Sequence, residues 1–300
     1  MKFQKKTVTI QQLAHGETLA IQTHVFAGKK EGPTIYLQAN LHGPEVFGTA
    51  LLLELIEVLK KKKDIKGRVI IVPCANPTAV SQVAYNSMVG RWNPQSGANW
   101  NRIFSLAGTG DSIEAKLAAA LGSLSAGADY VLDIHTTGSA NAEHLFTYPW
   151  MHETFAALGT PFHLELDPDE VVGAFDESHA QATVATWEAH HHGDIDAVIL
   201  KQRLSQLLNW LNSVWGQKYV AKSKPKIFSK STHLHAPIAG YYSWVKKVGD
   251  KVRAGETFAK VYQPMTGNIL SAKAKYAFTL LGIYGIAATA SGEQIGWIAY

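Results

Sequence analysis

The sequence predicts an α/β domain followed by a smaller all-β module. Short apolar, β-rich runs alternate with longer helical patterns through the first two thirds of the chain. After Gly216 a polar, lysine-rich segment begins, and beyond it short strands follow one another between glycine turns. We therefore expect one domain over residues 1–224 and a β-rich module over residues 225–300.

The elements of the first domain follow from apolar runs and helix caps. Buried strands are predicted at TIYLQANL (residues 34–41), GRVIIVPCAN (67–76) and DYVLDIHTTG (129–138). Helices are predicted at EVFGTALLLELIEVLKKKK (45–63), SIEAKLAAALGSLSAG (112–127) and AVILKQRLSQLLNWLNSVWG (197–216). Ser112 is the expected N-cap of the second helix, and Gly216 ends the third.

Composition excludes several classes of protein. With 46% hydrophobic and 17% charged residues, the chain of 300 residues is long enough for one large core and a smaller module. The net charge is +4, but the lysines are scattered or gathered at residues 60–63 and are not interleaved with aromatic side chains, so no nucleic-acid partner is expected. A single cysteine, Cys74, fits a reducing compartment. The first residues, MKFQKKTVTIQQLAHG, lack the apolar core of a signal peptide, and no apolar run is long enough for a bilayer span. We expect a cytoplasmic protein without a membrane partner.

The segment LQANLHGPEVFG (residues 37–48) places His42 and Glu45 where an apolar strand runs into a helix. Ligands of open α/β sheets bind at this edge. A histidine and a carboxylate suit zinc, and a catalytic zinc ion takes three protein ligands and keeps one open position. His135 ends another predicted strand and is the best third ligand, while Asp133 lies on the same strand face and can hydrogen-bond its imidazole. The alternative is that His135 is an ordinary core histidine.

Four motifs in order resemble the succinylglutamate desuccinylase and aspartoacylase family, which has a zinc carboxypeptidase-like fold. They are NLHGPEVFG (residues 40–48), VPCANPTA (72–79), NWNRIF (99–104) and LDIHT (132–136). The resemblance implies a mixed central sheet flanked by helices and one zinc ion per chain, bound by His42, Glu45 and His135. Members of the family often assemble, so a homo-oligomer is left open.

The resemblance also implies roles for residues near the metal. Asn101 and Arg102 would bind a substrate carboxylate, since a guanidinium can hold it with two hydrogen bonds. Arg91, in MVGRWNPQ (residues 88–95), would stabilise the oxyanion of the reaction. Glu188, in ATVATWEAHHHGD (residues 182–194), would be the general base.

Some positions leave alternatives open. Asn99 stands where the family usually has aspartate, and a neutral amide cannot pair with a guanidinium as an acid would, so the preferred substrate is left undetermined. Glu177 and Glu165 are the fallback bases. The run His190, His191 and His192 is expected at the pocket rim or surface, because consecutive residues of a strand point to opposite faces and the three cannot meet at one ion.

Other histidines carry weaker expectations. His15 and Glu17 have the wrong spacing for the metal motif and are expected in a loop, and a second metal site at His233 and His235 is not favoured. The C-terminal module resembles a biotinyl or lipoyl-type barrel-sandwich, but it lacks the lysine context of a modified carrier. It is therefore expected to be structural or to gate the substrate.

These observations predict a zinc-dependent amidohydrolase that removes the acyl group from an N-acyl amino acid or a similar small amide bearing a carboxylate. The first alternative uses the same metal and base but trims short peptides as a carboxypeptidase. The second is a non-catalytic zinc-binding scaffold that keeps the fold and its β module.

Overall fold

The computed structural model describes residues 1–84, 87–170, 172–179, 181–217, 224–285 and 287–300. Within these residues the largest sheet has nine strands in the order β1-β2-β4-β3-β7-β11-β9-β10-β12. Their bounds are β1 Lys2–Gln12, β2 Thr18–Ala27, β3 Lys30–Ala39, β4 Lys66–Val72, β7 Tyr130–Thr136, β9 His144–Thr147, β10 Phe162–Glu165, β11 Thr183–His190 and β12 Lys226–Phe228. Parallel and antiparallel pairs both occur, so the mixed central sheet is confirmed.

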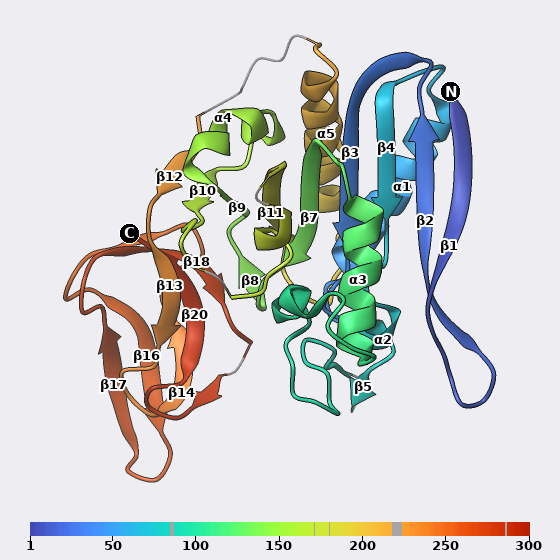
Figure 1. Cartoon of the computed structure of the whole chain (residues 1–300). Helices are drawn as coiled ribbons and strands as arrows, with labels where there is room; N and C mark the ends of the chain where they lie inside the picture. Colours follow the sequence, from blue (N-terminus) through green and yellow to red (C-terminus); the bar gives the residue numbers. More distant parts are fainter. Residues whose placement is uncertain (85–86, 171, 180, 218–223, 286) are drawn as a thin grey trace.

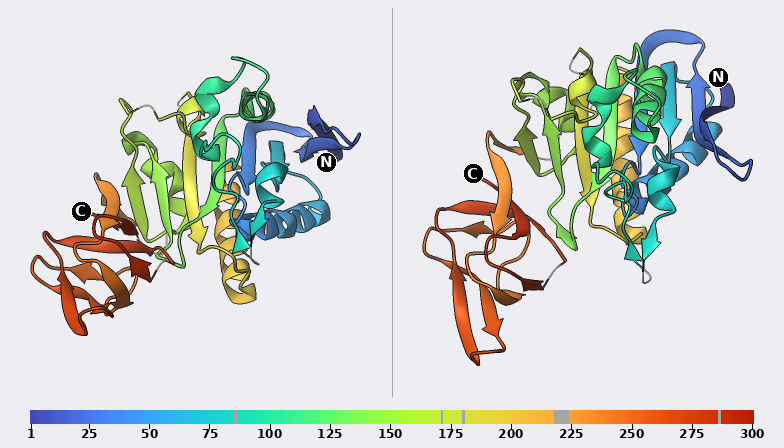
Figure 2. Two further views of the ribbon diagram at one scale, coloured as in Figure 1. Left: turned by 90° about the horizontal axis from the view of Figure 1, so that it is seen from below. Right: turned by 60° about the horizontal axis from the view of Figure 1, so that its bottom comes forward.

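Helices cover both faces of this sheet. The α-helices are α1 Val46–Lys61, α2 Pro77–Val80, α3 Ile113–Ser125, α4 His152–Phe155 and α5 Ala197–Val214. Short 3-10 helices are η1 Trp100–Arg102, η2 Phe104–Leu106, η3 Pro149–Met151, η4 Ala156–Leu158 and η5 Glu177–His179. Figures 1 and 2 show α1 and α5 side by side on one face and α3 on the other.

Local sequence explains the long helices. In α1 the buried side chains recur at helical spacing, as Leu51, Leu52, Leu55, Ile56 and Leu59, and two lysines occupy its last turn. The Ser112 side chain accepts a hydrogen bond from the Ala115 N–H, which confirms the predicted N-cap of α3. Helix α5 is followed by Gly216 at φ 78°, in the left-handed conformation that glycine adopts readily.

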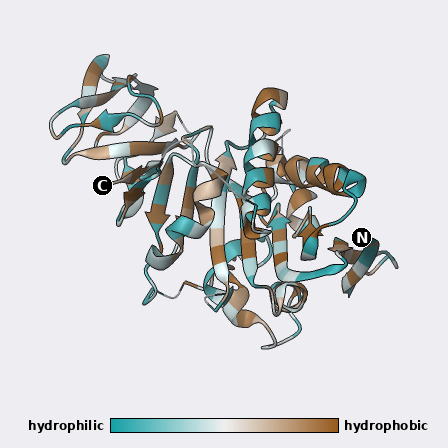
Figure 3. Cartoon of the chain, turned by 90° about the horizontal axis from the view of Figure 1, so that it is seen from above, coloured by the Kyte–Doolittle hydropathy of each residue, from teal (hydrophilic) through white to brown (hydrophobic). Residues whose placement is uncertain are grey.

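One apolar core lies between the sheet and its helices. The central strands are buried, and in β3 and β7 almost every residue from Ile35 and from Val131 onward is inaccessible to solvent. Figure 3 shows brown apolar stretches interrupted by white and teal ones along both the strands and the helices. Strands buried on both faces are apolar along their whole length, so the polar residues within them require a separate explanation.

Two further sheets follow in the C-terminal part of the chain. Among the described residues, one has the order β13-β20-β18-β15, with β8 also paired to β18, and the other has the order β17-β16-β14-β19. Their bounds are β8 Ala140–Asn141, β13 Ser231–His235, β14 Gly240–Trp244, β15 Lys251–Val252, β16 Thr257–Gln263, β17 Asn268–Lys273, β18 Phe278–Ile283, β19 Ala288–Thr289 and β20 Gln294–Ala299. A separate apolar cluster lies between the two sheets.

These sheets are consistent with the predicted β module, while its barrel-sandwich arrangement and the domain boundary at residue 224 stay predictions. Residues 218–223 of the expected linker lie outside the described residues. Strand β12 joins the large sheet by pairing with β10, before the chain enters the module at β13. The antiparallel pair of β5 Val83–Ala84 and β6 Ser87–Met88 completes the strands of the described chain. Among all the described residues, no helix has the length and apolar character that a membrane crossing requires.

Candidate metal centre and active site

His42 is positioned by an unusual turn at the end of β3. Asn40 has φ 61°, a left-handed conformation that asparagine tolerates better than most residues. Its side-chain amide donates hydrogen bonds to the carbonyl oxygens of His42 at 2.7 Å and Gly43 at 3.2 Å. These bonds hold the turn that directs the chain from β3 toward α1. Such strained positions gather at functional sites.

Gly43 fixes the same turn against its neighbours. A Cβ atom at this position would lie 2.3 Å from the carbonyl oxygen of Ala79, so only glycine fits. The Gly43 N–H donates to the carbonyl oxygen of Gly90 at 2.9 Å, directly before Arg91. The histidine motif and the segment that carries Arg91 are therefore joined through the backbone.

His42, Glu45 and His135 come together in the interior. The two histidines are 3% exposed and Glu45 is 1% exposed. The Glu45 carboxylate lies 2.8 Å from the Nδ1 atoms of both His42 and His135, and the three residues form a group that could hold a metal ion. Because β3 and β7 are neighbouring parallel strands, their carboxyl ends meet at the same sheet edge, as the sequence predicts.

The remaining nitrogen of each histidine is held by another buried side chain. The Nε2 atom of His135 donates to Asp133 Oδ2 at 2.8 Å, which confirms the predicted contact. His42 Nε2 lies 2.9 Å from the Oδ1 atom of Asn99, which also accepts the Asn101 N–H at 2.9 Å. Polar partners of this kind orient the histidines of metal sites. Thus Asn99 contacts a candidate ligand, a role that its sequence position alone did not predict.

Charges within the group reinforce one another. Burial alone would raise the pKa of Glu45, but His135 and His42 hold it well below its ordinary value. For His135, burial alone would lower the pKa, yet Asp133 and Glu45 raise it well above its ordinary value. Burial lowers the pKa of His42 and favours its neutral imidazole. These carboxylates stabilise positive charge at the point where the candidate ligands meet.

Two buried carboxylate oxygens beside this group lack a partner within the described chain. They are Asp133 Oδ1 and Glu188 Oε2. Glu188 lies opposite His135 in the β7–β11 pair, and burial raises its pKa to about 7. A buried carboxylate oxygen without a hydrogen-bond donor is costly, and a nearby cation or water molecule would satisfy it. A zinc ion suits this site, because imidazole nitrogens and carboxylate oxygens are its usual ligands.

The two arginines predicted from the sequence lie on this side of the molecule. Arg91 Nη1 is 3.9 Å from Glu45 Oε1, and its side chain is 46% exposed. Arg102 ends η1 and is also exposed. Burial lowers the pKa of His233 in β13, and the charges of His235 and of these two arginines lower it further, to about 4. Asn101 uses its Oδ1 atom to accept the Phe175 N–H at 2.9 Å, so its amide nitrogen is what it can offer to a ligand.

The C-terminal sheets contribute residues that sequence reasoning did not select. The Tyr284 hydroxyl lies 2.9 Å from His233 Nδ1. Burial raises the pKa of Tyr284, while the nearby charge of Arg91 lowers it and that of Glu188 raises it. Strand β18 brings this tyrosine there by pairing with β8, directly after the loop that follows His135. No local pattern marks Tyr284, because its position depends on a pairing between residues that are far apart in the sequence.

The other sequence candidates lie elsewhere or have other partners. The Glu177 carboxylate accepts the backbone N–H groups of Val172 at 3.0 Å and Gly173 at 2.8 Å, and Glu165 lies 3.4 Å from His152. His15 and Glu17 form an exposed pair between β1 and β2. These contacts occupy the carboxylates of Glu177 and Glu165, whereas the Oε2 atom of Glu188 has no partner among the described residues.

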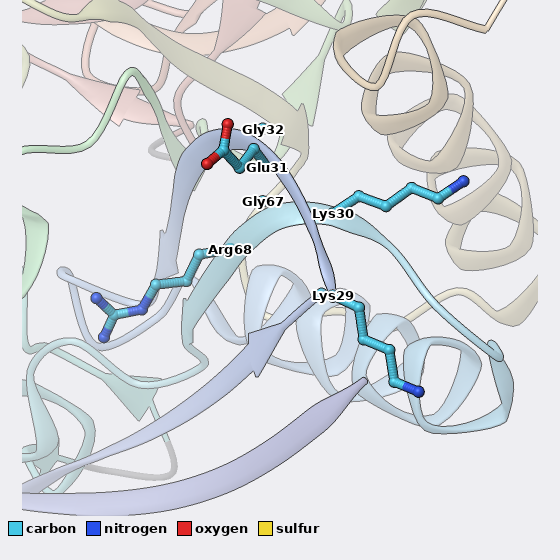
Figure 4. A pocket seen from close by; sticks show the side chains of 7 residues that line it. Lys29, Lys30, Glu31, Gly32, Gly67 and Arg68 are labelled. Carbon is cyan, nitrogen blue, oxygen red and sulfur yellow. The ribbon is translucent and has the colours of Figure 1, made fainter.

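A hollow of about 610 Å³ lies at the other end of the parallel strands, lined by Gly28, Lys29, Lys30, Glu31, Gly32, Gly67 and Arg68. It adjoins the amino ends of β3 and β4, whereas His42 follows the carboxyl end of β3. Figure 4 shows the side chains of Lys29, Lys30 and Arg68 extending in different directions. They do not converge on a common ligand, so this hollow is not the candidate site.

Comparison of the sequence with known protein families shows the family of this chain. The succinylglutamate desuccinylase/aspartoacylase catalytic domain matches residues 31–214, which include the metal residues and Glu188. The chain belongs to this family. A relative, N-alpha-acetyl-L-2,4-diaminobutyric acid deacetylase from Halomonas elongata, is 28% identical over 284 residues, covering 87% of this chain and 79% of that protein.

Solved structures of the succinylglutamate desuccinylase/aspartoacylase family share the fold. A candidate family member from Shewanella frigidimarina has a TM-score of 0.89 at 21% identity, with 99% of this chain and 97% of that chain covered. The product-bound ectoine utilization protein EutE (DoeB) from Ruegeria pomeroyi has a TM-score of 0.81 at 20% identity, with 99% and 94% covered. The similarity spans both the large sheet and the C-terminal sheets.

Proposed function

We propose that this protein is a zinc-dependent deacylase that cleaves the amide bond of an N-acyl amino acid. The observation that carries the proposal is the buried group of His42, Glu45 and His135 beside Glu188, whose Oε2 atom has no partner among the described residues. Family membership supports amide hydrolysis, and the Halomonas elongata relative is a deacetylase of an N-acetylated amino acid.

His42, Glu45 and His135 would hold the zinc ion. When bound, zinc supplies Lewis acidity toward the scissile carbonyl and the attacking water. Glu188 takes a proton from that water and delivers it to the leaving amine, the usual task of a general base that later acts as an acid. Burial raises the pKa of Glu188 to about 7 in the metal-free chain, and a bound cation would favour the ionised form that accepts the proton.

Arg91 and Arg102 each bind a different negatively charged group of the substrate. Arg91 is close to Glu45, so its guanidinium can donate to the oxyanion that develops at the carbonyl. Arg102 and the Asn101 amide nitrogen bind the carboxylate of the amino acid and align the amide with the metal residues. His233, uncharged at neutral pH with its pKa near 4, adds no further positive charge between them.

A small substrate is favoured over a peptide by the position of the C-terminal sheets. His233 lies within electrostatic reach of Arg91 and Arg102, and Tyr284 within reach of Arg91, so the β module borders the proposed active site. A carboxypeptidase acting on short peptides would use the same metal and base but needs room for further residues. We keep it as the alternative, and a non-catalytic scaffold as the second.

A panel of substrates tests the proposal. Zinc-loaded protein is assayed for amine release from N-acetyl, N-succinyl and other N-acyl amino acids, from their methyl esters and from dipeptides. We expect hydrolysis of at least one N-acyl amino acid and loss of activity when its carboxylate is esterified. Hydrolysis of dipeptides alone would favour the carboxypeptidase, and no hydrolysis of any substrate by zinc-loaded protein would favour the scaffold.

A further inference from the structure

A second cluster of potential metal ligands lies at the end of β11, formed by His190, His191 and Asp194. The Oδ2 atom of Asp194 is 3.7 Å from His190 Nε2 and 3.8 Å from His191 Nε2, and all ligand atoms lie within 4.8 Å of one another. The cluster shares no residue with the group formed by His42, Glu45 and His135.

The strand geometry explains why two of the three consecutive histidines converge. Their expected alternation applies to a regular strand, but the β7–β11 register shifts between Glu188 and His190, and β11 ends at His190. The rings of His190 and His191 consequently lie 4.0 Å apart. His192 turns to Thr136 at 2.8 Å, so the three histidines do not meet, as predicted, although alternation does not separate the first two.

Both imidazoles have a nitrogen available for a ligand. His190 has an 11% exposed side chain, and its Nε2 atom is buried without a hydrogen-bond partner among the described residues. His191 Nδ1 lies 3.2 Å from the carbonyl oxygen of His192, so it carries the proton and Nε2 keeps its lone pair. Asp194 Oδ2 forms only long ion-pair contacts with the two Nε2 atoms, at distances beyond the usual length of a hydrogen bond.

We propose that His190, His191 and Asp194 bind a second divalent transition-metal ion of the zinc type. With ligand bonds of about 2.0–2.2 Å, the ligand atoms of a tetrahedral zinc site are roughly 3.4 Å apart. The separations of 3.7 and 3.8 Å between Asp194 Oδ2 and the two Nε2 atoms are within a few tenths of an ångström of that spacing, and the Asp194 side chain, which is 52% exposed, has room to adjust. That exposure also leaves room for water as the fourth ligand.

The charges around the cluster permit a cation. Arg203 lies near enough to lower the pKa of His190, whose burial has the larger effect in the same direction. The Nη1 atom of Arg203 is 2.8 Å from Glu143 Oε2, so the charge of Arg203 is already paired. The Asp196 carboxylate, which caps α5, is also close to both histidines and adds negative charge.

The ion would fasten the loop beside the proposed active site. Between the ligands, the Gly193 N–H donates to the carbonyl oxygen of Pro44 at 3.1 Å, and the His192 N–H donates to that of Gly138 at 2.8 Å. Both acceptors belong to segments that directly adjoin His42, Glu45 or His135. A structural ion here would therefore restrain His192 and the loops that support the first metal group.

Zinc stoichiometry over a series of buffered free-zinc concentrations tests the proposal. We expect the wild type to bind two zinc ions, and His191→Ala and Asp194→Asn to bind one. His15→Ala is the matched control, because His15 and Glu17 form an exposed histidine–carboxylate pair without a second histidine. That variant should still bind two.

The His135→Ala background separates the second site from the first. In this background one ion should remain, and the double variant with His191→Ala should bind none. Circular dichroism of His191→Ala and Asp194→Asn checks that both variants remain folded. If His191→Ala and Asp194→Asn both retained the zinc content of the wild type, or if the wild type bound no ion beyond one lost in His135→Ala, the assignment would be overturned.

Discussion

Glu188→Gln keeps the size of the side chain and removes its ability to accept a proton. If Glu188 is the general base, kcat falls by roughly a hundredfold or more, the usual scale of such catalysis. The zinc content should not change, because Glu188 is not among the three proposed ligands. Amine release and zinc analysis on the same preparations measure both quantities.

The same substitution has a consequence for the stability of the metal-free protein. Raising the pKa of Glu188 from 4.5 to about 7 means that its ionised form costs the folded state ~3 kcal/mol. The folded pKa lies above the unfolded one, so this cost is absent below pH 4.5 and complete above pH 7. Metal-free Glu188→Gln should therefore match the wild type in acid and exceed its unfolding free energy by about 3 kcal/mol at pH 8.

Denaturant unfolding with a chelator present, at several pH values, gives this difference directly. Glu177→Gln is the control, because the Glu177 carboxylate already accepts backbone N–H groups and should lose stability on substitution. Two results would refute the reasoning. One is a rate near that of the wild type, which would pass the base role to Glu177 or Glu165. The other is a stability difference that does not grow between acid and neutral pH.

Three other substitutions test the ligands, the carboxylate site and the junction with the β module. His135→Ala should lose the active-site zinc ion, and full occupancy in elemental analysis would contradict the ligand set. Arg102→Lys should lower kcat/KM by about tenfold or more while Arg68→Lys, at the other sheet edge, leaves it unchanged; equal kinetics would place the carboxylate elsewhere. Gly138 has φ 60°, and Gly138→Ala would put a Cβ atom 2.2 Å from the carbonyl oxygen of Ile283, so it should destabilise the fold by about 1–3 kcal/mol. Gly122→Ala in α3 should not destabilise the fold, and thermal unfolding of both variants measures the difference.

Much of the fold could be predicted because its cause is local. The strands β3, β4 and β7 are apolar runs, and α1 and α5 have buried side chains at helical spacing. The meeting of His42, Glu45 and His135 could also be predicted, since two strand ends with metal-binding residues imply a shared sheet edge. The roles given to Glu188, Arg91, Asn101 and Arg102 stay predictions.

The remaining features depend on contacts between residues that are distant in sequence. Asn99 reaches His42 across 57 positions, and no pattern around it indicates that contact. Tyr284 comes near Arg91 because β18 pairs with β8, and the rings of His190 and His191 lie together where a register shift interrupts β11. Pairings of this kind are decided by the packed structure as a whole rather than by local preference.

Amine release from the best N-acyl amino acid, followed through zinc removal and restoration, tests the central claim most directly. The account predicts activity in the wild type, its loss on chelation and its recovery on adding zinc, with no recovery in His135→Ala. Activity that persists after all zinc has been removed, or that returns in His135→Ala, would contradict it.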